Sequence, residues 1–270
     1  MHRPSLTASA VVAATVIACA TNPATGRKQL MLVSEAQEIA MGKGADQAAV
    51  AAYGLYPDPK VQAYVDRLGK GLAAQSARPD LPWSFKVVDD PTVNAFALPG
   101  GYIYVTRGIM AHLRSEAELV AVLGHEIGHV TGRHSASQMS KQQLAMGGLI
   151  VGMAVEPELQ RFGGLAQQAL GLLFLKFGRD DENQADELGL RYMARQDYDP
   201  REMLEVFGVL DGVTRAEGGR ARMPDWLSTH PSPGNRNTRI QAQIAATGAS
   251  GSRVNRREYV ERLDGMVFGD

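Results

Sequence analysis

The spacing of apolar residues predicts two amphipathic helices and a small sheet in the first part of the chain. Apolar side chains recur with a helical period over residues 34–52 and again over residues 59–77. Three shorter segments alternate like strands or are rich in strand-forming residues: 84–89, 94–98 and 102–106. The last two are joined by Pro99, Gly100 and Gly101, which form a turn signal.

After residue 106 the whole pattern is helical. Ser115 followed by Glu118 is the signature of a capping box, and the apolar positions Leu119, Val122 and Ile127 behind it keep a 3.6-residue period. Further helical patterns cover residues 142–155, 159–177, 181–196, 200–217, 235–246 and 256–263. The chain is therefore predicted to form one mainly helical α+β domain with one small β-sheet.

The first residues resemble an export signal. Arg3 is followed by an uncharged, mostly apolar stretch over residues 5–18, which is shorter than the ~20 residues that a membrane-spanning helix needs. The stretch leads into residues 16–19 (VIAC), which resemble the bacterial lipobox, where the cysteine is acylated and becomes the mature N-terminus. We therefore expect residues 1–18 to be a lipoprotein-type signal peptide. The alternative is a general secretion signal that happens to contain a cysteine.

Cys19 is the only cysteine of the chain, and a mature protein without other thiols suits an oxidising compartment. A lipid on Cys19 would anchor the protein to a membrane. Ala20, rather than Asp, follows it, which resembles the sorting pattern of outer-membrane lipoproteins. We expect a periplasm-facing lipoprotein of the bacterial cell envelope, at the outer rather than the inner membrane. Residues 19–33 lack periodicity and are expected to be a tether, so that the folded domain covers residues 34–270.

Composition narrows the choice of partners. The 270 residues are 44% hydrophobic and 21% charged, with a formal net charge of -1. These values are ordinary for a globular protein of one or two domains. The sequence has no long basic run with interleaved aromatic residues, which argues against nucleic acid as a partner.

A His-Glu-x-x-His pattern lies within the capped helix. His125 and His129 are four residues apart and share one helix face, so both imidazoles can reach one ion. Glu126 stands beside them, where its carboxylate can take a proton from a metal-activated water. A helix with two histidines in structural roles is the alternative. The spacing favours a metal ion, with Zn²⁺ as the expected cofactor.

A catalytic zinc ion needs a third protein ligand and one open position for water. Gly132 stands where the metzincin pattern requires a glycine, but that pattern places its next histidine at residue 135, which is Ser135 in this chain. His134 comes one residue early. On a continuing helix it would point away from the ligand face, which makes it a poor ligand.

The second candidate for the third ligand is Glu182, in a separate acidic segment. Asp186 follows one turn later on the same face, where its carboxylate could accept the free ring N–H of a liganding histidine. An acidic helix start that interacts with the helix dipole would have a similar sequence. From spacing alone, the choice between these interpretations stays open.

Three motifs together resemble peptidase family M48, a family of zinc metallopeptidases: residues 94–104 (NAFALPGGYIY), 125–134 (HEIGHVTGRH) and 182–186 (ENQAD). The likeness extends over residues 34–246. It implies a zincin-like domain in which His125, His129 and Glu182 bind one Zn²⁺, Glu126 is catalytic and Asp186 supports a ligand. The chain lacks the transmembrane helices of the multi-span members and is similar to the small lipoprotein or periplasmic members.

The same resemblance implies that a strand at a sheet edge pairs with an extended substrate beside the metal. The expected substrate-binding residues are Asn94, Ala95, Phe96 and Ala97. A plain hairpin around Gly100 and Gly101 would look the same locally, so this interpretation also has an alternative.

The family also carries a His-Pro motif with a downstream arginine, which His230 and Arg236 match. His230 is expected near the metal. There it would either stabilise the oxyanion in catalysis or bind the ion as a fourth ligand that holds the enzyme inactive. Arg236 is expected to anchor this loop through a carboxylate.

The expected function is that of a zinc-dependent endopeptidase. Its polypeptide substrates would be unfolded or misassembled envelope proteins, hydrolysed by a metal-activated water. The alternative is a non-proteolytic envelope chaperone or assembly factor whose zinc site is structural or blocked by the protein itself.

Overall fold

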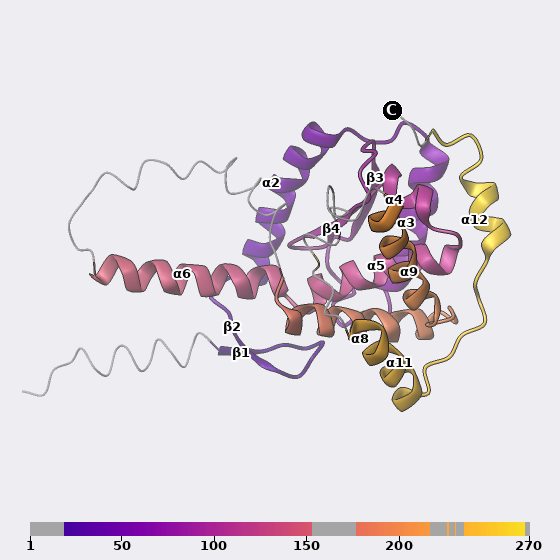
Figure 1. Cartoon of the computed structure of the whole chain (residues 1–270). Coiled ribbons are helices and arrows are strands. Elements are labelled where there is room, and N and C mark those ends of the chain that lie inside the picture. The colour runs from indigo at the N-terminus through magenta and orange to yellow at the C-terminus, as the bar shows by residue number, and fades with distance from the viewer. Residues whose placement is uncertain (1–18, 153–176, 217–225, 227–229, 231–234, 268–270) are drawn as a thin grey trace, which may run out of the picture.

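The computed structural model describes residues 19–152, 177–216, 226, 230 and 235–267. At its centre lies helix α5 (Glu116–Thr131), and every residue of this helix is buried (Figure 1). Apolar and small residues make up most of this helix, and its ionisable side chains find polar partners inside the protein, so that it can bury its whole circumference. The signal peptide expected at residues 1–18 and nearly all of the helix expected at residues 159–177 lie outside the described residues.

Helix α5 begins where the capping signature predicts. The Ser115 hydroxyl accepts a hydrogen bond from the backbone N–H of Glu118 at 3.0 Å, which satisfies one of the free donors of the first turn. The Glu118 carboxylate does not complete a reciprocal box. It accepts instead from the backbone N–H of Arg114 at 2.5 Å and from the Arg114 guanidinium at 2.7 Å. The predicted helix start is confirmed, and only half of the box forms.

A three-stranded sheet packs against α5. Its strands are β3 (Ser84–Val88), β4 (Ala95–Leu98) and β5 (Tyr102–Thr106), which match the three predicted strands. β5 lies in the middle, parallel to β3 and antiparallel to β4, so that β4 forms one edge. Gly100 and Gly101 make the turn between β4 and β5 with φ angles of 81° and 104°, which residues with side chains rarely adopt.

The other described helices that match predicted ones are α2 (Glu35–Tyr53), α3 (Pro59–Ala73), α6 (His134–Gly152), α8 (Arg179–Arg195), α9 (Glu202–Ala216), α11 (Arg236–Thr247) and α12 (Arg256–Arg262). The short helix α4 (Arg107–His112) was not predicted. The prediction for α3 ran too far, to residue 77, and α6 begins at His134 rather than at residue 142. In Figure 1, α6 extends away from the rest of the molecule. Among the described helices, none is both long and apolar enough to cross a bilayer.

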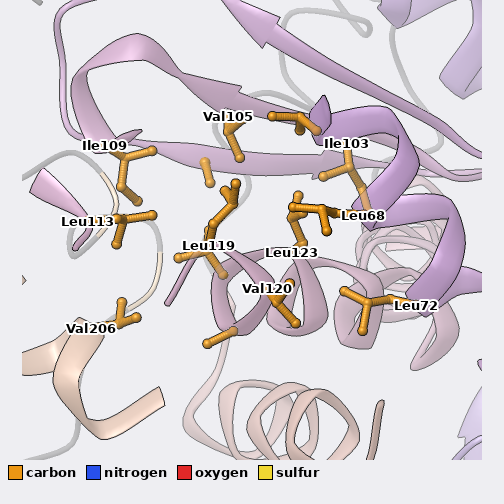
Figure 2. Packing of buried hydrophobic residues seen from close by; sticks show 14 of the residues in the cluster. Leu68, Leu72, Ile103, Val105, Ile109, Leu113, Leu119, Val120, Leu123 and Val206 are labelled. Atoms are coloured by element: carbon orange, nitrogen blue, oxygen red, sulfur yellow. The ribbon is translucent and has the colours of Figure 1, made fainter. Parts of the chain in front are cut away.

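The side chains of Leu119, Val120 and Leu123 project from α5 into the main hydrophobic core (Figure 2). Their neighbours in this core come from three elements: Leu68 and Leu72 of α3, Ile103 and Val105 of β5, and Val206 of α9. Burying a side chain of this size contributes ~1.5–3 kcal/mol. The core therefore fixes the position of α5 between the sheet and the helices.

The segment expected to be a tether contains a second sheet, so the prediction of one sheet was incomplete. Residues Cys19–Thr21 form β1 and Lys28–Leu30 form β2, which pair antiparallel. The buried side chain of Asn22 follows β1, and its Nδ2 donates to the carbonyl oxygens of Gly132 at 2.8 Å and Thr131 at 3.3 Å. These carbonyls lie at the C-terminal end of α5, where no helical partner remains for them. Strands this short give no readable alternation, which is why the pattern missed them.

Glu116 holds the other end of α5. Its buried carboxylate accepts hydrogen bonds from the hydroxyls of Tyr64 at 3.0 Å and Tyr198 at 2.6 Å, and from Nδ2 of Asn255 at 2.8 Å. Burial raises the pKa of Glu116, but these hydrogen bonds outweigh burial and lower the pKa overall. An ionised carboxylate thus joins α5 to α3 and to the segments around residues 198 and 255.

Replacing Asn22 with alanine should reduce the free energy of unfolding by about 1–3 kcal/mol, because buried carbonyls at the end of α5 lose their donor. Urea denaturation measures this change. Asn237→Ala, at an exposed position in α11, is the matched control and should change stability by about 0.5 kcal/mol or less. Equal effects of the two substitutions would show that the hairpin does not stabilise the domain.

Candidate metal centre

Two histidines of α5 direct their Nε2 atoms to one position, as the i, i+4 spacing predicts. The Nε2 atoms of His125 and His129 lie 3.0 Å apart, and both side chains are buried. The ring centroids are 4.7 Å apart, with 74° between the planes. Two imidazoles that share one helix face in this way can bind a common ion.

Helix α8 crosses α5 closely because the crossing is made of glycine and alanine. A Cβ atom on Gly128 would lie 2.7 Å from the carbonyl oxygen of Ala185, which is closer than a side chain tolerates. The close approach brings Glu182 of α8 to the two histidines. Its Oε1 lies 3.4 Å from Nε2 of His129, and its Oε2 lies 3.5 Å from Nε2 of His125.

A fourth side chain, His230, joins the group from the C-terminal part of the chain. Its Nδ1 lies 3.0 Å from Oε1 of Glu182 and 3.3 Å from Nε2 of His125. One ligand atom from each of the four residues lies within 4.8 Å of all the others, and all four residues are buried. The structure therefore brings together the three expected ligands and the histidine that was expected nearby.

The geometry of these atoms fits a zinc ion. Four ligands at ~2.0–2.1 Å in a tetrahedron are about 3.3 Å apart. The closest pairs in this group are separated by 3.0 to 3.5 Å, counting both oxygens of Glu182, and every pair lies within 4.8 Å. Oε2 of Glu182 is also buried without a hydrogen-bond partner among the described residues, although Nη1 of Arg236 lies 3.4 Å away. A metal ion in the centre of the group would give this oxygen a direct partner. Imidazole and carboxylate are the donors that zinc prefers alongside thiolate.

Asp186 and Arg236 support His125 on the side away from this group. Oδ1 of Asp186 lies 2.9 Å from Nδ1 of His125 and accepts its ring proton, so that Nε2 is the atom that faces the other ligands. Arg236 of α11 donates two hydrogen bonds to the same carboxylate, from Nε at 2.9 Å and from Nη2 at 2.6 Å. The expected carboxylate anchor of Arg236 is Asp186.

The ionisable groups of the site shift one another strongly. Burial lowers the pKa of His125, but hydrogen bonds to Asp186 and Glu182 outweigh it and raise the pKa to about 9. Burial holds the pKa of His129 well below its ordinary value. Burial also raises the pKa of Glu182, yet the neighbouring histidines, His230 first, outweigh it and hold that pKa well below its usual range. The carboxylate is therefore ionised and ready to bind a cation.

Glu126 points into the same region. Its Oε1 accepts a hydrogen bond from the indole Nε1 of Trp226 at 3.2 Å and lies 3.5 Å from Nε2 of His230. Its Oε2 is buried without a hydrogen-bond partner in the part of the chain that the structure describes. No role for Trp226 was predicted from the sequence. An aromatic residue in a segment without a helical period gave no signal that could connect it with Glu126.

The edge strand β4 lies close to these residues. Ala97, Leu98 and Pro99 line the same small cavity as His129, and Oδ1 of Asn94 is buried without a hydrogen-bond partner among the described residues. The side chain of Phe96 points the other way. It stacks on Tyr104 at 4.7 Å between ring centroids, in a second cluster beneath α2. Of the expected substrate-binding residues, Phe96 can contribute only its backbone.

Two further residues enclose His129. His134 places its Nδ1 2.9 Å from Nδ1 of His129, and Phe177 stacks on the His129 ring with 4.1 Å between centroids. His134 is outside the group of four converging side chains. Burial lowers the pKa of His134 to about 4, which keeps its ring neutral. From the sequence, His134 was considered only as a metal ligand and not as a residue that supports one.

A buried helix with the His-Glu-x-x-His pattern, completed by a glutamate from a second helix, defines a metallopeptidase of the HExxH class. The comparison with known families agrees with this class. The profile of peptidase family M48 matches residues 59–244, which is most of the chain, and the chain belongs to this family.

Several characterised proteins are similar to this chain. The mitochondrial metalloendopeptidase OMA1 of Schizosaccharomyces pombe is 34% identical over 223 residues, which cover 81% of this chain and 64% of that protein. OMA1 of Arabidopsis thaliana is 38% identical over 64% of this chain and 34% of its own length. The beta-barrel assembly-enhancing protease of Escherichia coli K12 is 29% identical over 80% of this chain and 45% of its own length. The chain thus spans between about a third and two thirds of these relatives.

Replacing Arg236 with leucine should lower the free energy of unfolding by about 3–5 kcal/mol, because the buried carboxylate of Asp186 loses its cation. Urea denaturation in the presence of a chelator measures this without a contribution from metal binding. Arg257→Leu removes an arginine that is 92% exposed and should change stability by about 0.5 kcal/mol or less. Combining Arg236→Leu with Asp186→Asn should restore part of the loss. Failure of the double variant to recover stability would contradict the charge-pair explanation.

Proposed function

We propose that this protein is a zinc-dependent endopeptidase that hydrolyses peptide bonds of unfolded or misassembled envelope proteins. The observation that carries the proposal is the convergence of His125, His129 and Glu182 in a buried site, with Glu126 beside them. Membership of peptidase family M48 supports it independently.

Each residue of the site has a separate role in the proposed hydrolysis. When bound, a zinc ion supplies the Lewis acid that activates a water molecule and polarises the scissile carbonyl. Glu126 is the general base. Trp226 fixes its Oε1, while Oε2 has no hydrogen-bond partner among the described residues and can take a proton and return it to the leaving amine. Asp186, held by Arg236, keeps His125 in the tautomer that binds a metal.

An extended polypeptide is the substrate that the edge of the sheet suits. Among the described strands, β4 pairs with β5 alone, and its residues Ala97 and Leu98 line a small cavity together with His129. Backbone pairing along Asn94, Ala95, Phe96 and Ala97 would hold a substrate with little demand on its sequence. This agrees with a preference for unfolded chains, which expose backbone groups that folded proteins hide.

The proposed location is the bacterial cell envelope, with the protein anchored by a lipid on Cys19 after removal of residues 1–18. Cys19 is exposed, and Asn22 beside it is fixed to the end of α5. A lipid at this position would hold the peptidase domain close to the membrane surface rather than at the end of a long tether. The E. coli relative, whose name connects it with beta-barrel assembly, supports an envelope function.

His230 suggests that the described conformation is a closed one. Its Nδ1 takes the fourth position of the ligand group, which a catalytic site leaves open for water. Of the two roles expected for His230, this arrangement favours the fourth ligand over the oxyanion donor. The same arrangement also fits the second candidate function, that of a non-proteolytic envelope factor whose metal site is blocked by the protein itself. Catalysis requires that His230 withdraws.

Glu126→Gln should lower kcat/KM for the digestion of casein by about 10²–10⁴-fold, because the amide cannot act as a base. Bound zinc, measured by elemental analysis, should stay at the wild-type level because Glu126 is not a ligand. Glu187→Gln, at an exposed position of α8, is the matched control and should keep full activity. Digestion at the wild-type rate by Glu126→Gln would eliminate this residue as the base. A purified wild type that never cleaves casein would favour the non-proteolytic alternative.

His230→Ala should raise the rate of casein digestion, because the fourth position is then free. If the open conformation is ~10% populated or less, the increase is about 10-fold or more. Zinc content should not change, since three ligands remain. His112→Ala removes an exposed histidine of α4 and serves as the control. A loss of activity in His230→Ala, with zinc retained, would instead identify His230 as an oxyanion donor.

A further inference from the structure

The chain reverses direction directly after the two helix histidines. α5 ends at Thr131, Gly132 follows as the C-cap, and Arg133 takes a φ of 55°, in the left-handed region that residues with side chains seldom adopt. α6 then begins at His134. The reversal returns the His134 side chain to the helix that the chain has just left.

Gly132 provides the space for the returned ring. A Cβ atom on Gly132 would lie 2.4 Å from Nε2 and 2.7 Å from Cε1 of His134. Any side chain at this position would collide with the imidazole. A glycine two residues before a histidine is thus required for the packing of this ring, although it is not part of a metzincin ligand pattern.

The returned ring meets His129 edge to face. The two Nδ1 atoms are 2.9 Å apart, and the ring planes are inclined at 82°. Nε2 of His129 faces the opposite way, towards Glu182 and His125. To bind a metal through Nε2, His129 must carry its proton on Nδ1, and the acceptor that the described residues offer to this proton is Nδ1 of His134.

We propose that His134 is the positioning residue of His129, and that its Nδ1 accepts the Nδ1–H of His129 as Asp186 accepts that of His125. It fixes the ring orientation and the tautomer in which Nε2 can bind zinc. The two histidines of the motif are then supported by chemically different partners, a carboxylate for His125 and a neutral imidazole for His129. This inference rests on the proposed function, because it presupposes that His129 binds the metal.

The turn that carries His134 is itself held in place. Nε of Arg133 donates to Glu38 of α2 at 2.5 Å, and its Nη2 donates to the carbonyl oxygen of Val33 at 2.9 Å. The Gly132 carbonyl accepts from Asn22 at 2.8 Å. These contacts hold Arg133 in its unusual backbone conformation, and they give His134 the rigidity that a positioning residue needs.

The test is the affinity for Zn²⁺, measured by competition with a chromophoric chelator on the purified full chain. His134→Leu should weaken zinc binding about 10–100-fold, as the loss of a partner of a metal ligand does. Gly132→Ala should weaken it as well, because it displaces the ring without removing it. His112→Leu, at an exposed position, should bind zinc as the wild type does.

Two variants with amide side chains, His134→Asn and His134→Gln, distinguish a hydrogen-bond role of this residue from a packing role. An asparagine at residue 134 can place its oxygen near the position of Nδ1, whereas a glutamine places its oxygen near that of Nε2. His134→Asn should therefore bind zinc more tightly than His134→Gln, and this comparison decides the question even if His134→Leu does not fold. Equal affinities of the two amide variants, or wild-type affinity in a folded His134→Leu, would overturn the inference. Failure of the wild type to bind zinc would contradict the proposed function instead.

Discussion

The close crossing of α5 and α8 is the constraint on which the site depends. Glu182 can reach His125 and His129 only because Gly128 of α5 faces the backbone of Ala185, with no room for a Cβ atom between them. Gly128 thus sets the distance between the two helices, although it looks like the least informative residue between the two histidines of the motif. A metal site assembled from two helices needs its ligands positioned to within a fraction of an ångström, and backbone contact is the stiffest way to achieve this.

Around this crossing, buried carboxylates lie next to positively charged groups. Glu182 and Asp186 are both fully buried, and Arg236 faces both of them. A buried carboxylate without a partner costs several kcal/mol. The arginine offsets one of the two negative charges, and a divalent cation would meet the other. The polar groups at the two ends of α5 are also paired. The Glu116 carboxylate and the last carbonyls of the helix each accept hydrogen bonds from donors in distant parts of the chain.

Much of the fold and of the site could be predicted from the sequence. The i, i+4 histidines, the capped start of α5 and the three strands of the main sheet depend on local spacing, which the sequence displays directly. The choice of Glu182 over a nearer ligand required the family resemblance, because no local rule brings residue 182 to residue 129. The β1–β2 hairpin was missed because strands of three residues have no detectable period. The contact of His134 with His129 was missed because it depends on a non-glycine residue, Arg133, in the left-handed conformation.

The proposed metal site requires that three side chains from two helices share one metal ion. X-ray diffraction of the zinc-loaded protein, with anomalous data collected at the zinc absorption edge, tests it most directly. We expect one strong anomalous peak at ~2.0–2.2 Å from Nε2 of His125, Nε2 of His129 and a carboxylate oxygen of Glu182. A peak bound by the two histidines but out of reach of Glu182, or located elsewhere in the molecule, would contradict it.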